Sequence, residues 1–78
     1  MAQQIKQNGQ VVMTAPGEGN PSCAIIFRHL TGETFGREEQ RQYRNYLAMM
    51  FHDFPKLTYG EIELWEDGKF KQKGNINK

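Results

Sequence analysis

Four basic side chains recur along residues 36–54 at intervals that place them on one side of a helix. They are Arg37, Arg41, Arg44 and His52. At 3.6 residues per turn, their spacings of 4, 3 and 8 residues keep them within about 80° of arc. Guanidinium groups bind phosphates and carboxylates with paired N–H donors, so this stripe could hold a nucleic acid or an acidic protein surface. The alternative is a solvated helix back, which Glu38 and Arg41 would suit as an (i, i+3) ion pair.

The second candidate site is an exposed tryptophan. Trp65 and Tyr59 lie on the charged outer face of an expected strand, where Lys69 is opposite Trp65. Tryptophan is enriched at the hot spots of protein interfaces, so we expect these three residues to bind a partner protein. The alternative is that Trp65 packs over the stem of Lys69 or is covered by the N-terminal segment. A cation–π contact of about 0.5–1 kcal/mol would hold the ring there.

Few side chains of the sequence could serve catalysis or bind a metal. His29 and His52 lie on different expected elements, and Cys23 is the only cysteine. The chain therefore has neither a His-x-x-x-His pair nor a Cys-rich zinc site. Glu61 and Glu63 could form an acid–base pair on one strand face, but the lysines expected opposite them make them cross-strand partners instead. We expect no enzymatic activity, no cofactor and no metal site.

Composition limits the class of protein. The chain has 78 residues, of which 37% are hydrophobic and 24% are charged, and its formal net charge is +1. These values are typical of one small globular domain over residues 1–78, and dedicated DNA-binding domains are usually more basic. No signal-peptide pattern is present, and no apolar run approaches the roughly 18 residues of a membrane span. We expect a cytoplasmic protein, or one of the host cytoplasm if its source is viral, with no membrane partner.

A helix over residues 36–53 must position the arginines. Thr34 or Gly36 can cap its start, and Pro55 disfavours helical geometry at Phe54. A group of large apolar and aromatic side chains shares the side of the helix away from the arginines. They are Tyr43, Tyr46, Leu47, Met50 and Phe54. This pattern predicts an aromatic-rich stripe that faces the core.

Two earlier segments have the composition of strands. The run Val11–Met13 is apolar, and Cys23–Leu30 is rich in isoleucine and phenylalanine. Alternation places Ile25 and Phe27 on the same face of the second segment, which we expect to be a central strand. The remaining segments are a loop with two prolines and two glycines over residues 15–22, and flexible ends over residues 1–9 and 74–78.

The segment LTYGEIELWEDGKFKQKG predicts a β-hairpin. A two-residue turn at Asp67-Gly68 would place Ile62 and Leu64 opposite lysines. A three-residue loop over residues 66–68, with its glycine in the left-handed conformation, pairs Leu64 with Phe70 and sets carboxylates opposite lysines. We therefore expect the longer loop, with Ile62, Leu64 and Phe70 facing the core.

Together these elements predict an α+β fold, in which one amphipathic helix packs on a three- to four-stranded, mainly antiparallel sheet in the rough order ββαββ. We expect a small binding protein without enzymatic activity: an adaptor, regulator or inhibitor of a larger protein or protein complex. Phage and mobile-element proteins such as anti-CRISPRs are similar in size alone. The alternative is a nucleic-acid-binding module that uses the arginine stripe. Unpaired strand edges would also allow a homodimer.

Overall fold

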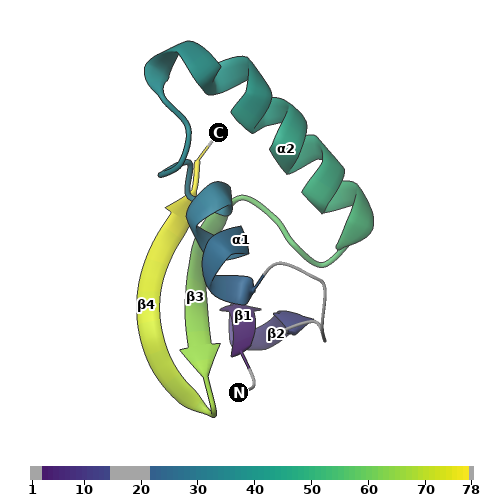
Figure 1. The fold of residues 1–78 in the computed structure, drawn as a ribbon. Coiled ribbons are helices and arrows are strands. Elements are labelled where there is room, and N and C mark those ends of the chain that lie inside the picture. The colour runs from purple at the N-terminus through teal and green to yellow at the C-terminus, as the bar shows by residue number, and fades with distance from the viewer. Residues whose placement is uncertain (1–2, 15–21, 78) are drawn as a thin grey trace.

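Four strands form one antiparallel sheet in the order β2-β1-β3-β4 (Figure 1). The computed structural model describes residues 3–14 and 22–77. The strands are β1 (Gln3–Gln7), β2 (Gln10–Thr14), β3 (Gly60–Glu66) and β4 (Lys69–Ile76). The helical elements are α1 (Cys23–Leu30), the 3₁₀ turn η1 (Arg37–Glu39) and α2 (Gln40–Asp53). The α+β class is confirmed, whereas the single helix of the predicted order ββαββ is corrected to two.

The N-terminal segment contributes a central strand, which corrects, for residues 3–9, the expectation that residues 1–9 are flexible. β1 lies between β2 and β3, and its Ile5 is fully buried. Asn8 and Gly9 join β1 to β2 with φ values of 53° and 78°. Positive φ at both central residues is what a type I′ hairpin turn requires. The strand predicted at Val11–Met13 is confirmed as part of β2.

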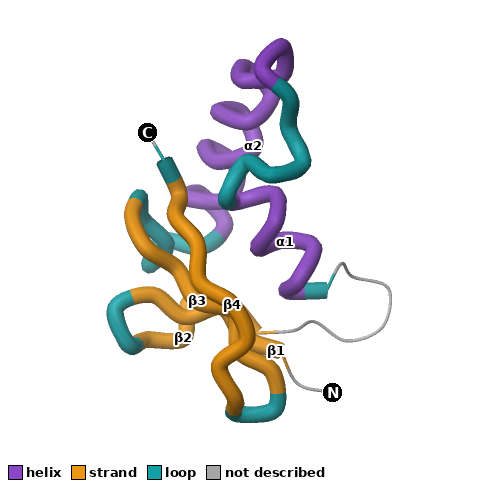
Figure 2. The backbone as a smooth tube through the Cα atoms, turned by 90° about the vertical axis from the view of Figure 1, so that its left-hand side faces the viewer, coloured by secondary structure: helices purple, strands orange, loops and turns teal. Residues whose placement is uncertain are grey.

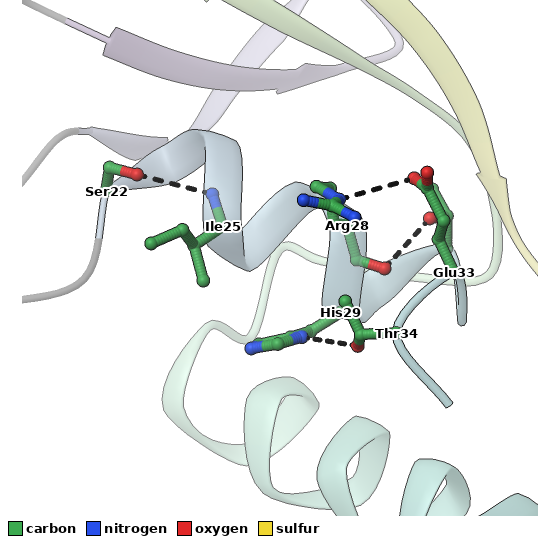
Figure 3. A network of polar contacts seen from close by, with 7 residues as sticks. Ser22, Ile25, Arg28, His29, Glu33 and Thr34 are labelled. Atoms are coloured by element: carbon green, nitrogen blue, oxygen red, sulfur yellow. Dashed lines mark hydrogen bonds and ion pairs between the residues drawn. The ribbon is translucent and has the colours of Figure 1, made fainter. Parts of the chain in front are cut away.

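The segment Cys23–Leu30 is helix α1, so its prediction as a strand was wrong. Its buried side chains recur at i, i+4 and i+7, the period of one helix face. They are Cys23, Phe27 and Leu30. Ser22 caps the helix, because its Oγ accepts a hydrogen bond from the backbone N–H of Ile25 at 3.3 Å (Figure 3). Residues 15–21 of the predicted loop lie outside the described residues.

Polar contacts from the last turn of α1 hold the chain reversal that follows it (Figure 3). Arg28 Nε lies 3.7 Å from Glu33 Oε2, and the backbone N–H of Glu33 donates to the carbonyl of Arg28 at 3.1 Å. His29 Nδ1 and Thr34 Oγ1 are 2.6 Å apart. Gly32, with φ of +82°, makes the sharp turn between these pairs. The reversal directs the chain toward η1 and α2.

The predicted long helix is confirmed over η1 and α2, and it ends at Asp53, two residues before Pro55. Its buried side chains are Tyr43, Leu47 and Met50, and Tyr46, Phe51 and Phe54 are partly buried. Tyr43 Oη donates to the carbonyl of Leu30 at 2.6 Å, which ties α2 to the end of α1. Figures 1 and 2 show α2 beyond α1, at the periphery of the molecule. The side of α2 away from its buried stripe is therefore exposed.

The β3–β4 hairpin turns through two residues, so the three-residue loop predicted over residues 66–68 was wrong. Glu66 pairs directly with Lys69 across the turn. Asp67 and Gly68 have φ values of 52° and 77°. The right-handed twist of paired strands favours this type I′ geometry, which an Asp-Gly dipeptide adopts readily.

A β-bulge at Lys71 removes the mismatch that had argued against the short turn. Trp65 pairs with Phe70, and the register then shifts by one residue before Leu64, which leaves Lys71 as the extra residue. Ile62 and Leu64 face the core as predicted, at 0% and 6% exposure. Phe70 does not, because its pairing with Trp65 places it on the other face of the sheet. It is 49% exposed.

The last strand continues to Ile76, which corrects, for residues 74–76, the expectation that residues 74–78 are flexible. Ile76 is buried, and Gly74 lies opposite Ile62 on the side of the sheet that α1 covers. A Cβ atom at Gly74 would lie only 3.0 Å from Cζ of Phe27. The glycine therefore lets α1 pack directly against the backbone of β4.

A buried glutamine side chain joins β1 to the segment that precedes β3. Gln7 is 4% exposed. Its Nε2 donates to the carbonyl of Thr58 at 2.7 Å, and its Oε1 accepts from the backbone N–H of Thr58 at 2.9 Å. Both polar ends of the amide are thus satisfied, as a buried amide requires. This two-bond clamp connects parts of the chain that are 51 residues apart.

Candidate functional site

The side of the sheet turned away from α1, which we term the outer sheet face, carries two rows of side chains across all four strands. The first row holds Thr14, Gln4, Trp65 and Phe70, and the second holds Val11, Lys6, Glu63 and Lys73. Both helices lie on the other side of the sheet (Figures 1 and 2). Within residues 3–14 and 22–77, no helix covers these rows.

Trp65 is held from three directions on the outer sheet face. Its ring meets that of Phe70 edge-on, with centroids 6.0 Å apart and an interplanar angle of 80°. Lys6 Nζ lies 4.0 Å from the centroid of the indole, and indole Nε1 donates to Glu63 Oε1 at 3.0 Å. The cation over the ring is thus Lys6 of the N-terminal strand rather than Lys69. These contacts fix the orientation of Trp65 before any partner binds.

Tyr59 and Lys69 do not join Trp65. Tyr59 lies six residues earlier, about 20 Å away along an extended strand, and its ring packs against Phe51 of α2 at 4.9 Å. Lys69 pairs with Glu66 beside the turn, so alternation points its side chain to the opposite side from Phe70. Phe70 occupies the place beside Trp65 that Tyr59 was expected to share. The signal that could have found it is the Asp-Gly dipeptide, whose two-residue turn pairs the two aromatic residues directly.

The predicted arginine stripe is exposed, and its members are Arg37 in η1 and Arg41 and Arg44 in α2. Within the described part of the chain none of the three forms an ion pair, and the Glu38–Arg41 pair that would suit the alternative of a solvated helix back is absent. His52 lies about 12 Å farther along the helix. Its side chain is 89% exposed, and its Nδ1 lies 3.5 Å from Asp53 Oδ1. The guanidinium groups are therefore available to an external anion.

Arg44 also lines a polar pocket of ≈ 240 Å³ at the start of α2. The pocket lies where α2 meets the ends of α1 and β4, and its lining residues are Thr31, Gly32, Gln40, Tyr43, Arg44 and Asn77. Several of these groups already have partners: the hydroxyl of Tyr43 donates to Leu30 and that of Thr31 donates to Arg28. The charged group that the pocket presents is the guanidinium of Arg44.

The nucleophilic and titratable groups of the interior serve packing. Cys23 is fully buried, its Sγ donates weakly to the carbonyl of Gln3 at 3.7 Å, and burial raises the pKa of its thiol. A raised pKa keeps the thiol protonated near neutral pH, which does not favour a nucleophile. Among the described residues, no group of three His, Cys, Asp or Glu side chains could hold a metal ion, and no helix has the length and apolar character to cross a membrane.

The buried thiol and phenol predict a fold that weakens in alkali. Burial raises the pKa of Cys23 above 9.0 and that of Tyr43 above 10.0. The unfolded chain, with ordinary pKa values, then loses these protons first and binds fewer protons than the folded chain. Stability should fall as pH rises above about 9, by up to about 1.4 kcal/mol per pH unit for each group.

Urea unfolding midpoints between about pH 8 and pH 10.5 measure this decline. The matched control is Cys23→Ala, which should flatten the curve between about pH 9 and pH 10 because the thiol is gone. A wild-type midpoint that stays constant or rises over this range would contradict the assignment.

A family model described as "Domain of unknown function (DUF7688)" matches residues 2–77. No curated protein matches the chain, and no solved structure matches it.

Proposed function

The chain belongs to the DUF7688 family, and we propose that it is a non-enzymatic binding protein that docks on a larger protein through its outer sheet face. In this role it acts as an adaptor, regulator or inhibitor. The observation that carries the proposal is Phe70, which is 49% exposed beside the fixed ring of Trp65 on a sheet face that no helix of the described residues covers. A lone cysteine suits a reducing compartment, so we place this activity in the cytoplasm.

The aromatic pair has the features of an interface anchor. Trp65 is oriented by Lys6 and Glu63, so little side-chain freedom is lost when a partner covers it. Phe70 adds exposed apolar area next to it, and such aromatic residues carry a disproportionate share of binding energy. The second row of the outer sheet face supplies charged side chains at the rim. An aromatic centre with a polar rim is typical of protein interfaces.

The charges around the pair indicate the chemistry of the partner. β4 carries Lys69, Lys71 and Lys73 along the edge of the sheet, where Lys69 points to the opposite side from Phe70 and Lys73 Nζ lies 3.6 Å from Glu61 Oε2. Lysines and a bulge on an edge strand oppose pairing with another edge, which disfavours a second copy of this chain at β4. They favour a different protein, with an apolar pocket for Phe70 and acidic side chains facing the β4 edge.

The test is quantitative recovery of partners by the tagged full chain from lysate of its native cell, or of the host cell if it is viral. Phe70→Ala and Trp65→Ala should each reduce recovery of the specific partner by about 30-fold or more, because hot-spot substitutions cost about 2 kcal/mol or more. Phe70→Ala should leave the free energy of unfolding within about 1 kcal/mol of wild type, since the ring is half exposed.

The matched control is Met49→Ala, which removes another exposed apolar side chain, 52% exposed, from α2 on the far layer. Its partner recovery should equal that of wild type. The proposal is wrong if Phe70→Ala recovers the same proteins as wild type, if Met49→Ala loses them equally, or if wild type recovers none. If Trp65→Ala unfolds, its loss of partner recovery has no bearing on the proposal, and the result for Phe70→Ala alone decides the outcome.

A further inference from the structure

The exposed side of α2 has a composition that the outer sheet face does not share. We define the outward face of α2 as the side centred on Arg41, Asn45 and Ala48, with Arg44 on one flank and Gln42 on the other. All five residues are exposed, and they lie opposite the buried stripe of the helix. Two charged groups, two amides and one small side chain thus project from adjoining turns, and the exposed side chains of Met49 and His52 follow on the same side.

The charge on this face has one sign. From Gln40 to His52 the helix contains no acidic residue, and the carboxylates of Glu38 and Glu39 lie in η1, before the helix begins. Within the described residues, Arg41 and Arg44 have no ion-pair partner. The outward face is therefore a local basic surface on a chain whose formal net charge is only +1.

The side-chain types match the edges of base pairs. Arginine binds the O6 and N7 atoms of guanine with two N–H donors, and asparagine or glutamine binds the N6 and N7 atoms of adenine in the same way. Arg41, Asn45 and Gln42 are residues of these kinds in the first half of the helix, the half that enters the groove in helix-turn-helix proteins. Ala48 leaves room for the backbone of α2 to approach.

The flank of the face suits a phosphate. Arg44 lines the polar pocket at the start of α2 together with Asn77 and with Gln40, whose Nε2 already donates to the carbonyl of Gly36 at 3.2 Å. Contacts with the DNA backbone position a protein on the duplex, and arginine and amide groups supply many of them. Base-edge donors at the centre and a phosphate-binding group at the side form the arrangement of a helix lying in a groove.

We propose that the outward face of α2 binds double-stranded DNA in the major groove. α2 has 14 residues and is about 21 Å long, and the major groove of B-DNA, about 12 Å wide, admits a helix. The peripheral position of α2 (Figure 1) leaves this side free to enter it. The deep, narrow major groove of duplex RNA would exclude the helix. This surface is separate from the outer sheet face, so it goes beyond the protein-binding function.

The experiment is fluorescence anisotropy of a labelled random-sequence DNA duplex of about 20 base pairs, two helical turns. The probe is titrated with the full chain between about 50 and 200 mM salt. With Arg37, Arg41 and Arg44 near phosphates or bases, the log–log slope of affinity against salt should be about −2 to −3. The double variant Arg41→Gln, Arg44→Gln should bind at least about tenfold more weakly for each arginine removed. Its slope should be shallower by about 0.9, because Arg44 contacts a phosphate whereas Arg41 contacts a base edge.

The control is the double variant Lys69→Gln, Lys71→Gln on β4, which lowers the net charge equally but leaves α2 intact. It should retain the affinity and salt slope of wild type within a factor of about two. The proposal is overturned if wild type does not bind DNA at low salt, or if the lysine variant weakens as much as the arginine variant. It is also overturned if duplex RNA or polyglutamate competes as well as duplex DNA, since either result assigns the arginines to another partner.

Discussion

Phe27→Ala should lower the free energy of unfolding by about 3–5 kcal/mol, the range for a large buried aromatic side chain. Phe27 is 1% exposed and lies between α1 and β4, against the backbone at Gly74. Removing the ring leaves a cavity that a glycine cannot fill. Since domains of this size are stable by about 4–12 kcal/mol, the variant should be close to unfolding at room temperature.

The informative control is Ile25→Ala. A strand over Cys23–Leu30 would place Ile25 and Phe27 on one face, so both substitutions would cost several kcal/mol. In helix α1, Ile25 is 48% exposed, and its truncation should change stability by no more than about 0.5–1 kcal/mol. Urea unfolding followed by far-UV circular dichroism measures both values. Similar losses for the two variants would show that the segment does not pack as α1.

Gly74→Ala should cost about 1–3 kcal/mol, because the new methyl group enters a space that is already filled. Its Cβ would lie 2.7 Å from Cγ2 of Thr31 and 3.0 Å from Cζ of Phe27. Both contacts are shorter than packed carbon atoms tolerate. α1 must shift away from β4, which loosens the layer on which the core depends. Thermal unfolding should show a decrease of roughly 5–20 °C in the midpoint for a domain of this size.

A second substitution, at Thr31, tests whether crowding around the new methyl group causes the loss of stability. Thr31→Ser removes Cγ2, the closest atom, and keeps the hydroxyl that donates to the carbonyl of Arg28 at 3.0 Å. Added to Gly74→Ala, it should recover about 0.5 kcal/mol or more, as neighbouring sites that share a clash are not additive. Asn75→Ala, at an exposed neighbouring position on β4, is the control and should be near neutral. If Thr31→Ser worsens the loss, crowding is not its cause.

The long helix could be predicted because its determinants are local. Pro55 restricts the conformation of the residue before it, and the spacing of Tyr43, Leu47 and Met50 allows one helix face only. The same spacing placed the arginines on the exposed side, which the structure agrees with. Over this length, the spacing of the apolar residues fits a helix and does not fit the alternation of a strand. The helix could therefore be recognised without knowledge of tertiary contacts.

The sequence pattern of Cys23–Leu30 did not distinguish helix α1 from a strand. Over eight residues, a run rich in isoleucine and phenylalanine satisfies a period of two and a period of 3.6 about equally. Ser22 at the N-cap and the i, i+4, i+7 spacing of Cys23, Phe27 and Leu30 were the helical signals. The β propensity of Ile25 and Ile26 outweighed these signals, although Ile25 is half exposed in α1 and does not pack in the core.

Which residues of β4 lie on the outer sheet face depends on how β4 pairs with β3. The two-residue turn pairs Phe70 with Trp65 on the outer sheet face, and the bulge at Lys71 then returns Gly74 and Ile76 to the core side; both depend on how β3 and β4 pair rather than on β4 alone. Cross-strand charge pairs favoured the wrong loop. They do not decide the register, because each pair is worth only about 0.2–1 kcal/mol. Burial of Ile62 and Leu64, which the bulge preserves, is worth more.

The clamp between Gln7 and Thr58 has a consequence for how the chain is made. The first hairpin and both helices leave the ribosome before β3 exists, so β1 lacks the neighbour that buries Ile5 against Leu64. Neither the central strand pair nor the amide clamp can close until nearly the whole chain has emerged. Closing contacts across more than 50 residues is slow, because the entropy of the loop is lost before the contacts form. Nascent chains that stall before β3 should therefore lack a stable fold and be ready substrates for cellular proteases.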